Sequence, residues 1–240
     1  MTDRLPLVWA LYKKEMRANF DTLTAYVVTV VILLISGYLF ASPMFLHNQA
    51  DLSAFVGVTP LLFLFFIPAV TMRLFAEEYK SGTIEILATL PVRDGEVLAV
   101  KYLGALSLIT FMLAGTLVYP VTLYILGKPD LGGIFGSYLG LWLTAGLLTA
   151  VGVWASSLTR NQIVAFILAF LVSFALFLLG KVNVFIPPAL GSVADFLGLD
   201  SHLANISRGV LDTRDLLYYL GLSGFFLYVT YLRVNARRIN

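Results

Sequence analysis

Six long apolar runs, separated by short polar connections, dominate the pattern of this chain of 240 residues. They cover residues 24–46, 52–72, 102–126, 131–158, 161–180 and 216–232. A helix needs about 20 predominantly apolar residues to cross the hydrocarbon layer of a bilayer. We therefore predict an all-α integral membrane protein with six transmembrane helices.

Two further segments have a mixed pattern. In residues 1–20, charged residues alternate with apolar residues that recur at helical spacing. The apolar residues are Leu5, Val8, Trp9, Tyr12, Met16 and Phe20. This spacing is typical of a helix that lies in the headgroup plane. Residues 181–215 are too polar to span the membrane, yet the run FIPPALGSVADFLGL is too apolar for a free loop. Because unpaired backbone cannot face lipid, we predict short re-entrant helices there, packed against protein.

The whole chain, residues 1–240, is thus predicted to form one transmembrane domain. It comprises an interfacial helix (1–20), spans one to five (24–180), a re-entrant connection (181–215) and a last span with a basic tail (216–240).

Composition supports the membrane assignment and excludes several classes of protein. The chain is 59% hydrophobic and 12% charged, with a mean hydropathy of +0.88, which is far too apolar for a soluble domain of this size. The absence of cysteine excludes a disulfide framework, a thiolate metal site and a cysteine nucleophile. A net charge of only +2 argues against nucleic acid as a partner.

Lysine and arginine are distributed unevenly between the two sides of the predicted bundle. If both termini are cytoplasmic, twelve of the sixteen basic residues fall on the cytoplasmic side. The other four are Lys128, Lys181, Arg208 and Arg214. Cytoplasmic loops of membrane proteins carry the excess of Lys and Arg, so we predict that both termini and the connection 73–101 are cytoplasmic.

The connection 73–101, RLFAEEYKSGTIEILATLPVRDGEVLAVK, contains signals for a short helix of its own. Ser81, Gly82 and Thr83 are cap-type residues, and Glu85 lies in the first turn that follows them. Pro91 ends the helix, so residues 83–90 are predicted to form two helical turns.

The next span has its own start signal, because Asp94 can cap it with Glu96 in its first turn. Within residues 83–90, Ile84 and Leu87 share one face and Ile86 and Leu90 another, so this helix can offer a ridge to a partner protein. An ordinary solvated loop remains the alternative on spacing alone.

Small residues indicate where helices approach closely. Gly132, Gly136, Gly140 and Thr144 recur every four residues in the fourth span, and Ala165, Ala169 and Ser173 do so in the fifth. Pro60, Pro68 and Pro120 favour kinks. The fifth span also carries a phenylalanine row, which is either a pore wall or a lipid-facing surface and consists of Phe166, Phe170, Phe174 and Phe177.

Catalytic chemistry is not evident in the sequence. No Asp, Glu, Lys, Arg or His lies inside the six predicted spans, which argues against a proton- or ion-coupled carrier. His47 and His202 lie outside the spans and are interpreted as loop residues rather than ligands. No P-loop is present, so any ATP that drives this protein is hydrolysed by another chain. We predict neither a catalytic residue nor a bound metal or cofactor.

A charged run precedes the last span. Its ionisable residues are predicted to pair with one another beside the outer leaflet, and they are Arg208, Asp212, Arg214 and Asp215. Asp212 or Thr213 can cap the last span.

Two of these segments resemble a known family. The connection 73–101 resembles the loop between the second and third spans of ABC-2 type export permeases, matching at Arg73, Glu77, Glu78, Gly82, Thr83, Glu85, Leu87 and Pro91. The run SRGVLDTRD at 207–215, together with NQIVAF and FIPAVTMRLFAEE, resembles the gliding-motility-associated ABC permeases.

The resemblance implies a transporter subunit rather than an enzyme. In that family the piece after the Gly-Thr is a coupling helix that docks on a cytoplasmic ATPase, and the ATPase holds ATP and Mg²⁺. The contact would comprise Glu77, Glu78, Gly82, Thr83, Ile84, Glu85, Leu87 and Pro91.

The resemblance also implies the assembly around the chain. The second and fifth spans border the translocation path and the dimer axis, which gives the phenylalanine row a place beside them. The expected partner is a second permease-type membrane subunit, with or without a large extracytoplasmic domain, and the expected location is the bacterial inner membrane. Two alternatives stay open: a subunit that transmits ATPase-driven movement without carrying cargo, and an ATP-independent channel.

Overall fold

The computed structural model describes residues 4–47, 51–84, 91–127, 130–182 and 196–239, and every regular element in these ranges is an α-helix. The helices are α1 (Arg4–Phe20), α2 (Leu23–His47), α3 (Ser53–Thr71), α4 (Arg73–Ser81), α6 (Asp94–Gly115), α7 (Val118–Leu126), α8 (Leu131–Leu158), α9 (Gln162–Val182), α11 (Leu199–Ser207) and α12 (Thr213–Ile239). Six of the described segments are long and apolar enough to cross a membrane, which confirms the predicted fold class.

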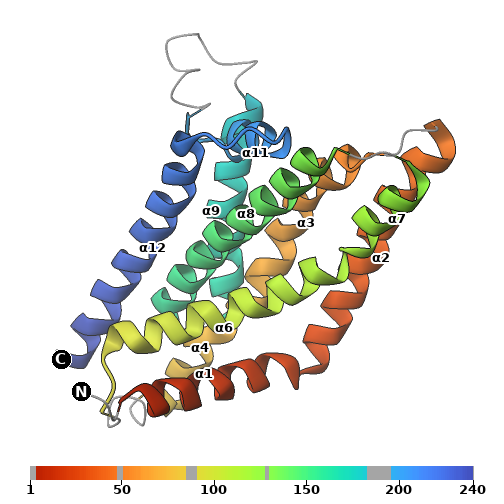
Figure 1. Cartoon of the computed structure of the whole chain (residues 1–240). Helices are drawn as coiled ribbons and strands as arrows, with labels where there is room; N and C mark the ends of the chain where they lie inside the picture. The colour runs from red at the N-terminus through yellow and green to blue at the C-terminus, as the bar shows by residue number, and fades with distance from the viewer. Residues whose placement is uncertain (1–3, 48–50, 85–90, 128–129, 183–195, 240) are drawn as a thin grey trace.

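Both ends of the chain lie at the same end of the helix bundle, together with α1 and α4 (Figure 1). We call this end the termini face, and the end that carries α11 the opposite face. At the termini face α1 turns sharply into α2 and runs along α6 (Figure 1). This arrangement agrees with a helix that lies across the end of the bundle rather than through it.

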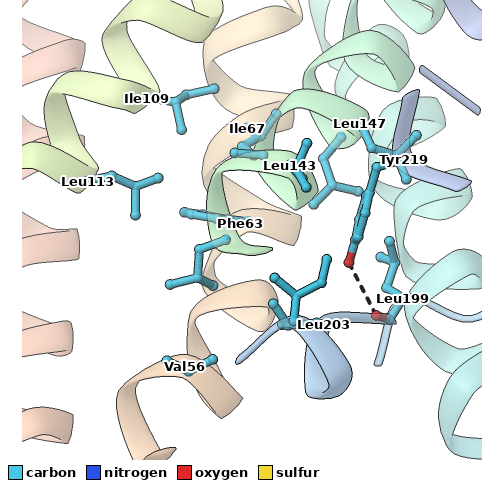
Figure 2. Close-up of a cluster of buried hydrophobic side chains, with 14 of the residues drawn as sticks. Val56, Phe63, Ile67, Ile109, Leu113, Leu143, Leu147, Leu199, Leu203 and Tyr219 are labelled. Atoms are coloured by element: carbon cyan, nitrogen blue, oxygen red, sulfur yellow. Dashed lines mark hydrogen bonds between the residues drawn. The ribbon is translucent and has the colours of Figure 1, made fainter. Parts of the chain in front are cut away.

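Helix α8 forms the centre of the bundle. It packs against α3, α9, α11 and α12, and 72% of its most apolar stretch is buried. Small residues along α8 permit this, because a Cβ atom added at Gly152 would lie 2.0 Å from the Thr71 hydroxyl oxygen. The cluster of buried side chains in Figure 2 joins α3, α6, α8, α11 and α12 on this side of the molecule.

The third predicted span is two helices rather than one. Helix α6 ends at Gly115 and α7 begins at Val118, two residues before Pro120. Proline has no N–H to donate to the carbonyl four residues earlier and its ring crowds that carbonyl, which here belongs to Thr116. The Tyr119 backbone N–H and the Tyr138 hydroxyl donate to this carbonyl instead, at 2.9 and 2.8 Å. The break confirms the disruption predicted from Pro120.

Two span boundaries differ from the prediction. The third span was expected to begin at residue 102, but α6 begins at Asp94. The last was expected to cover residues 216–232, but α12 extends from Thr213 to Ile239. Both differences have the same cause: polar turns continue these helices beyond their apolar stretches, and an apolar window does not detect them.

Candidate functional site

The candidate site begins where α3 passes into α4 at the termini face. Ser156 of α8 is fully buried, and its hydroxyl oxygen accepts hydrogen bonds from the backbone N–H groups of Phe75 and Ala76, at 2.9 and 3.1 Å. The same hydroxyl donates to the Met72 carbonyl at 3.0 Å. These backbone groups lie in the first turn of α4, where intrahelical partners are missing. The side chain of Ser156 therefore fixes the start of α4 on the central helix.

The end of α4 is defined by Gly82, which has a φ of +75°. Glycine adopts this left-handed conformation without steric cost, and it commonly follows the last helical residue. The Ser81 hydroxyl lies 2.9 Å from that of Thr83, and Thr83 and Ile84 resume helical structure. The sequence indicated Gly82 only as a residue at the start of the helix 83–90. In the structure Gly82 also ends α4.

The remainder of the predicted coupling helix lies outside the described residues. Glu85 and Leu87 belong to it, so the structure says nothing of their contacts. Pro91, the next described residue, is exposed. Helix α6 then begins at Asp94, and the carboxylate of Glu96 accepts from the Arg93 N–H at 2.8 Å. The cap position is therefore Arg93 rather than Asp94, which is a correction of one residue.

A buried ionic cluster anchors α4. Lys101 of α6 is only 2% exposed, and its ammonium donates to the Glu78 carboxylate at 2.6 Å. It also donates to Glu15 of α1 at 3.2 Å and to the Leu74 carbonyl at 2.7 Å. Glu78 thus pairs with a lysine of another helix, while Glu77 is exposed.

Arg73 has a different role at the other end of α4. Its guanidinium donates to the Ala18 carbonyl at 3.3 Å and to the side chains of Asn19 and Thr22 at 3.1 and 3.2 Å. These acceptors lie at the turn between α1 and α2. Helix α4 is therefore held at its start by Arg73 and near its end by Glu78.

The phenylalanine row of α9 lies partly inside the bundle. Phe166, Phe170 and Phe174 stack on one another, with ring centroids 6.4 and 5.6 Å apart, and Phe65 of α3 packs against Phe170 at 5.0 Å. Phe177 is buried. The row therefore runs along the contact between α3 and α9, and both of its proposed roles stay open.

On the opposite face, the glycine seam of α8 receives α11. A Cβ atom added at Gly136 would lie 2.0 Å from the Ile206 carbonyl oxygen, and one at Gly140 would lie 2.7 Å from the side chain of Leu203. The predicted close approach is therefore present, although its partner is a short helix of the 181–215 connection rather than another span. Residues 183–195 of that connection lie outside the described residues.

A second buried pair fixes α11 to α12. His202 is 6% exposed and Asp215 is 3% exposed, and the His202 Nδ1 lies 2.6 Å from the Asp215 carboxylate. The His202 Nε2 lies 2.9 Å from the Phe196 carbonyl oxygen, and the imidazole stacks on Tyr218 at a centroid distance of 4.0 Å. The interpretation of His202 as a loop residue was wrong. The sequence did contain a signal for a buried helical position of His202, because Leu199 and Leu203 lie beside it at helical spacing.

The four charged residues before the last span are not brought together. Asp215 is buried against His202, whereas Arg208 and Arg214 are exposed. No ion pair joins Arg208 or Arg214 to a carboxylate within the described ranges. Asp212 accepts from the Arg214 backbone N–H at 2.9 Å, which confirms the predicted cap of α12.

A cavity of about 690 Å³ opens on the opposite face between α3, α8, α9 and α11. Lys181 and Asp200 on its wall form an ion pair at 2.5 Å. Among the residues that the structure describes, no group of three or more His, Asp or Glu side chains could hold a metal ion. The described charged clusters join helices to one another.

Comparison with known families identifies the chain. A family model described as ABC-2 family transporter protein matches residues 12–176, from the middle of α1 to the last turns of α9. A search of curated proteins found no match. Because the family model covers more than half of the sequence, this chain belongs to the ABC-2 family of transporter proteins and is a membrane permease.

Proposed function

We propose that this permease couples ATP hydrolysis by a separate cytoplasmic ATPase to the export of cargo across a bacterial inner membrane. In this proposal, residues 83–90 form the coupling helix that contacts the ATPase. The ATPase binds ATP and Mg²⁺, and a second permease-type subunit completes the transmembrane path. The gliding-motility-associated permeases are the proposed subfamily.

The anchoring of α4 is the observation that supports this function best. Residues 83–90 follow directly after a helix that is held by Ser156 of α8, by Arg73 and by the Lys101 cluster. A force applied to a segment on such a rigid base moves the base, whereas the same force on a free loop is lost in local bending. This arrangement is what a contact for a force-generating partner requires.

The distribution of charge supports the proposed orientation. The α3–α6 connection, the chain ends and the α8–α9 turn share the termini face, and they carry most of the basic residues (Figure 1). Lys181, Arg208 and Arg214 lie towards the opposite face. By the positive-inside rule the termini face is cytoplasmic, which is the side where ATP is available.

Reconstitution with the ATPase tests this proposal. The permease is purified from native membranes together with the subunit that hydrolyses ATP. The activity of this ATPase is then compared in proteoliposomes that contain the permease and in proteoliposomes that lack it. Glu85→Lys is expected to abolish the stimulation while membrane insertion persists. Asp21→Lys is the matched control, because Asp21 is exposed on the same face outside the proposed contact.

Gly82 provides a second pair of variants at one position. Proline cannot adopt the φ of +75° found at Gly82, whereas asparagine tolerates the left-handed region. Gly82→Pro is therefore expected to abolish the stimulation and Gly82→Asn to preserve most of it. Unchanged stimulation in both Glu85→Lys and Gly82→Pro would refute the proposed contact.

A further inference from the structure

Lys101 lies where three helices of the termini face meet. Its ammonium has three N–H donors, and each has an acceptor: Glu15 on α1, and Glu78 and the Leu74 carbonyl on α4. The ammonium also lies 5.2 Å from the ring centroid of Phe75. A single side chain of α6 thus connects α6 to both α1 and α4.

The carboxylate of Glu78 depends on this contact. Its Oε1 atom accepts from Lys101, while its Oε2 atom is buried without a hydrogen-bond partner among the described residues. A buried carboxylate that loses its cation is left with an uncompensated charge, which is strongly unfavourable. Lys101 therefore supplies the charge that compensates the buried Glu78 carboxylate.

Helix α1 is seated on α6 by close packing beside the same cluster. A Cβ atom added at Gly104, one turn after Lys101, would lie 3.2 Å from the Cβ atom of Glu15. One turn further on, the Ser107 hydroxyl lies 2.7 Å from the Tyr12 hydroxyl. Glycine at position 104 therefore allows the Glu15 carboxylate to reach the ammonium.

Stability alone does not account for this cluster. Replacing buried ion pairs by apolar side chains of similar volume is often neutral or stabilising, because charges lose hydration when they are buried. An apolar cluster would fill the same space but would contain no directional contacts. Directional hydrogen bonds from one ammonium to two helices fix their relative position instead.

We propose that Lys101 is a positioning residue for energy coupling, which holds α1, α4 and α6 as one rigid unit on the ATPase side of the permease. Movement of residues 83–90 then displaces the second and third spans together with α1. This inference rests on the proposed function, because it assigns to the unit the transfer of ATPase movement.

Spin labels can test the rigid unit directly, because the chain contains no cysteine and needs no background removal. Ala10→Cys places one label on an exposed position of α1, and Lys80→Cys places the other on an exposed position of α4. Double electron–electron resonance gives the distance distribution between them in lipid nanodiscs. It is recorded first for the chain alone, and then for the complex with its ATPase, nucleotide-free and trapped with ATP and vanadate.

The informative variant removes the cluster's charges together. Lys101→Met alone leaves two buried carboxylates, so it can fail simply by misfolding. The triple variant Lys101→Met, Glu15→Gln and Glu78→Gln leaves no net charge, and it is expected to keep the thermal midpoint of the parent chain. Its distance distribution should broaden, and its stimulation of the ATPase should fall roughly tenfold. Lys13→Met, at an exposed position of α1, is the matched control and should change neither.

The outcomes separate this inference from the proposed function. A distance in the parent complex that changes between the two nucleotide states would overturn the rigid unit, as would a narrow distribution and full stimulation in the triple variant. If the parent chain stimulates no ATPase, the proposed function fails. In that case a narrow distribution in the parent chain and a broad one in the triple variant would still support the rigid unit.

Discussion

At the scale of single residues, the described structure places two buried polar clusters at opposite ends of the bundle. Lys101 and its carboxylates join helices at the termini face, and His202 with Asp215 joins α11 to α12 at the opposite face. Both were missed from the sequence, because the residues involved lie just outside the apolar runs and 13 or more positions apart. Burial in such positions depends on which helices become neighbours, which no local pattern encodes.

The buried pair on α11 and α12 gives a prediction about stability. Asp215→Asn removes the carboxylate that faces His202, and it is expected to lower the free energy of unfolding by about 2–4 kcal/mol. Thermal unfolding in nanodiscs measures this, and faster hydrogen exchange in α11 should accompany it. Asp200→Asn is the control, because the Lys181–Asp200 pair is much more exposed and should contribute less than about 1 kcal/mol. Equal losses in the two variants would contradict the account.

At the scale of helices, the sequence predicted the spans well. Apolar length decides whether a helix can cross a bilayer, and Pro120 marked the place where α6 and α7 separate. The partner of the glycine seam was not predictable in the same way. Spacing at Gly132, Gly136 and Gly140 showed that something approaches closely, but its identity as α11 depends on the fold of the 181–215 connection.

The seam can be tested by adding one methyl group. Gly136→Ala places a Cβ atom 2.0 Å from the Ile206 carbonyl oxygen, so α11 must move away. The expected loss of stability is about 1–3 kcal/mol, measured by thermal unfolding, with weaker hydrogen-exchange protection of α11. Gly221→Ala in α12 is the matched control, because no atom lies within 4 Å of its added Cβ and alanine favours a helix. An unaffected Gly136→Ala variant would show that α11 does not occupy the seam.

At the scale of the whole molecule, the arrangement places α4, the ionic cluster of Lys101 and both chain ends on one face (Figure 1). The order of the spans and of the connections between them could be predicted from the hydropathy of the sequence. The packing of α8 at the centre was not, because its burial depends on contacts with α3, α9, α11 and α12 together.

Orientation is a prediction of its own. Single cysteines at Asp51→Cys and Lys80→Cys lie at opposite ends of α3 and α4, at exposed positions. In intact cells a membrane-impermeant maleimide is expected to label position 51 and to leave position 80 unlabelled until the membrane is permeabilised. The reverse pattern would place the termini face outside and would remove the proposed ATPase contact.

Site-specific crosslinking tests the central claim most directly. A photo-crosslinker attached to Glu85→Cys, in a chain with no other cysteine, is activated in the native complex, and the adducts are identified by mass spectrometry. The account predicts adducts with the ATPase from position 85 and none from Asp51→Cys on the opposite face. Adducts with the ATPase from position 51, or none from position 85 in a complex that hydrolyses ATP, would contradict it.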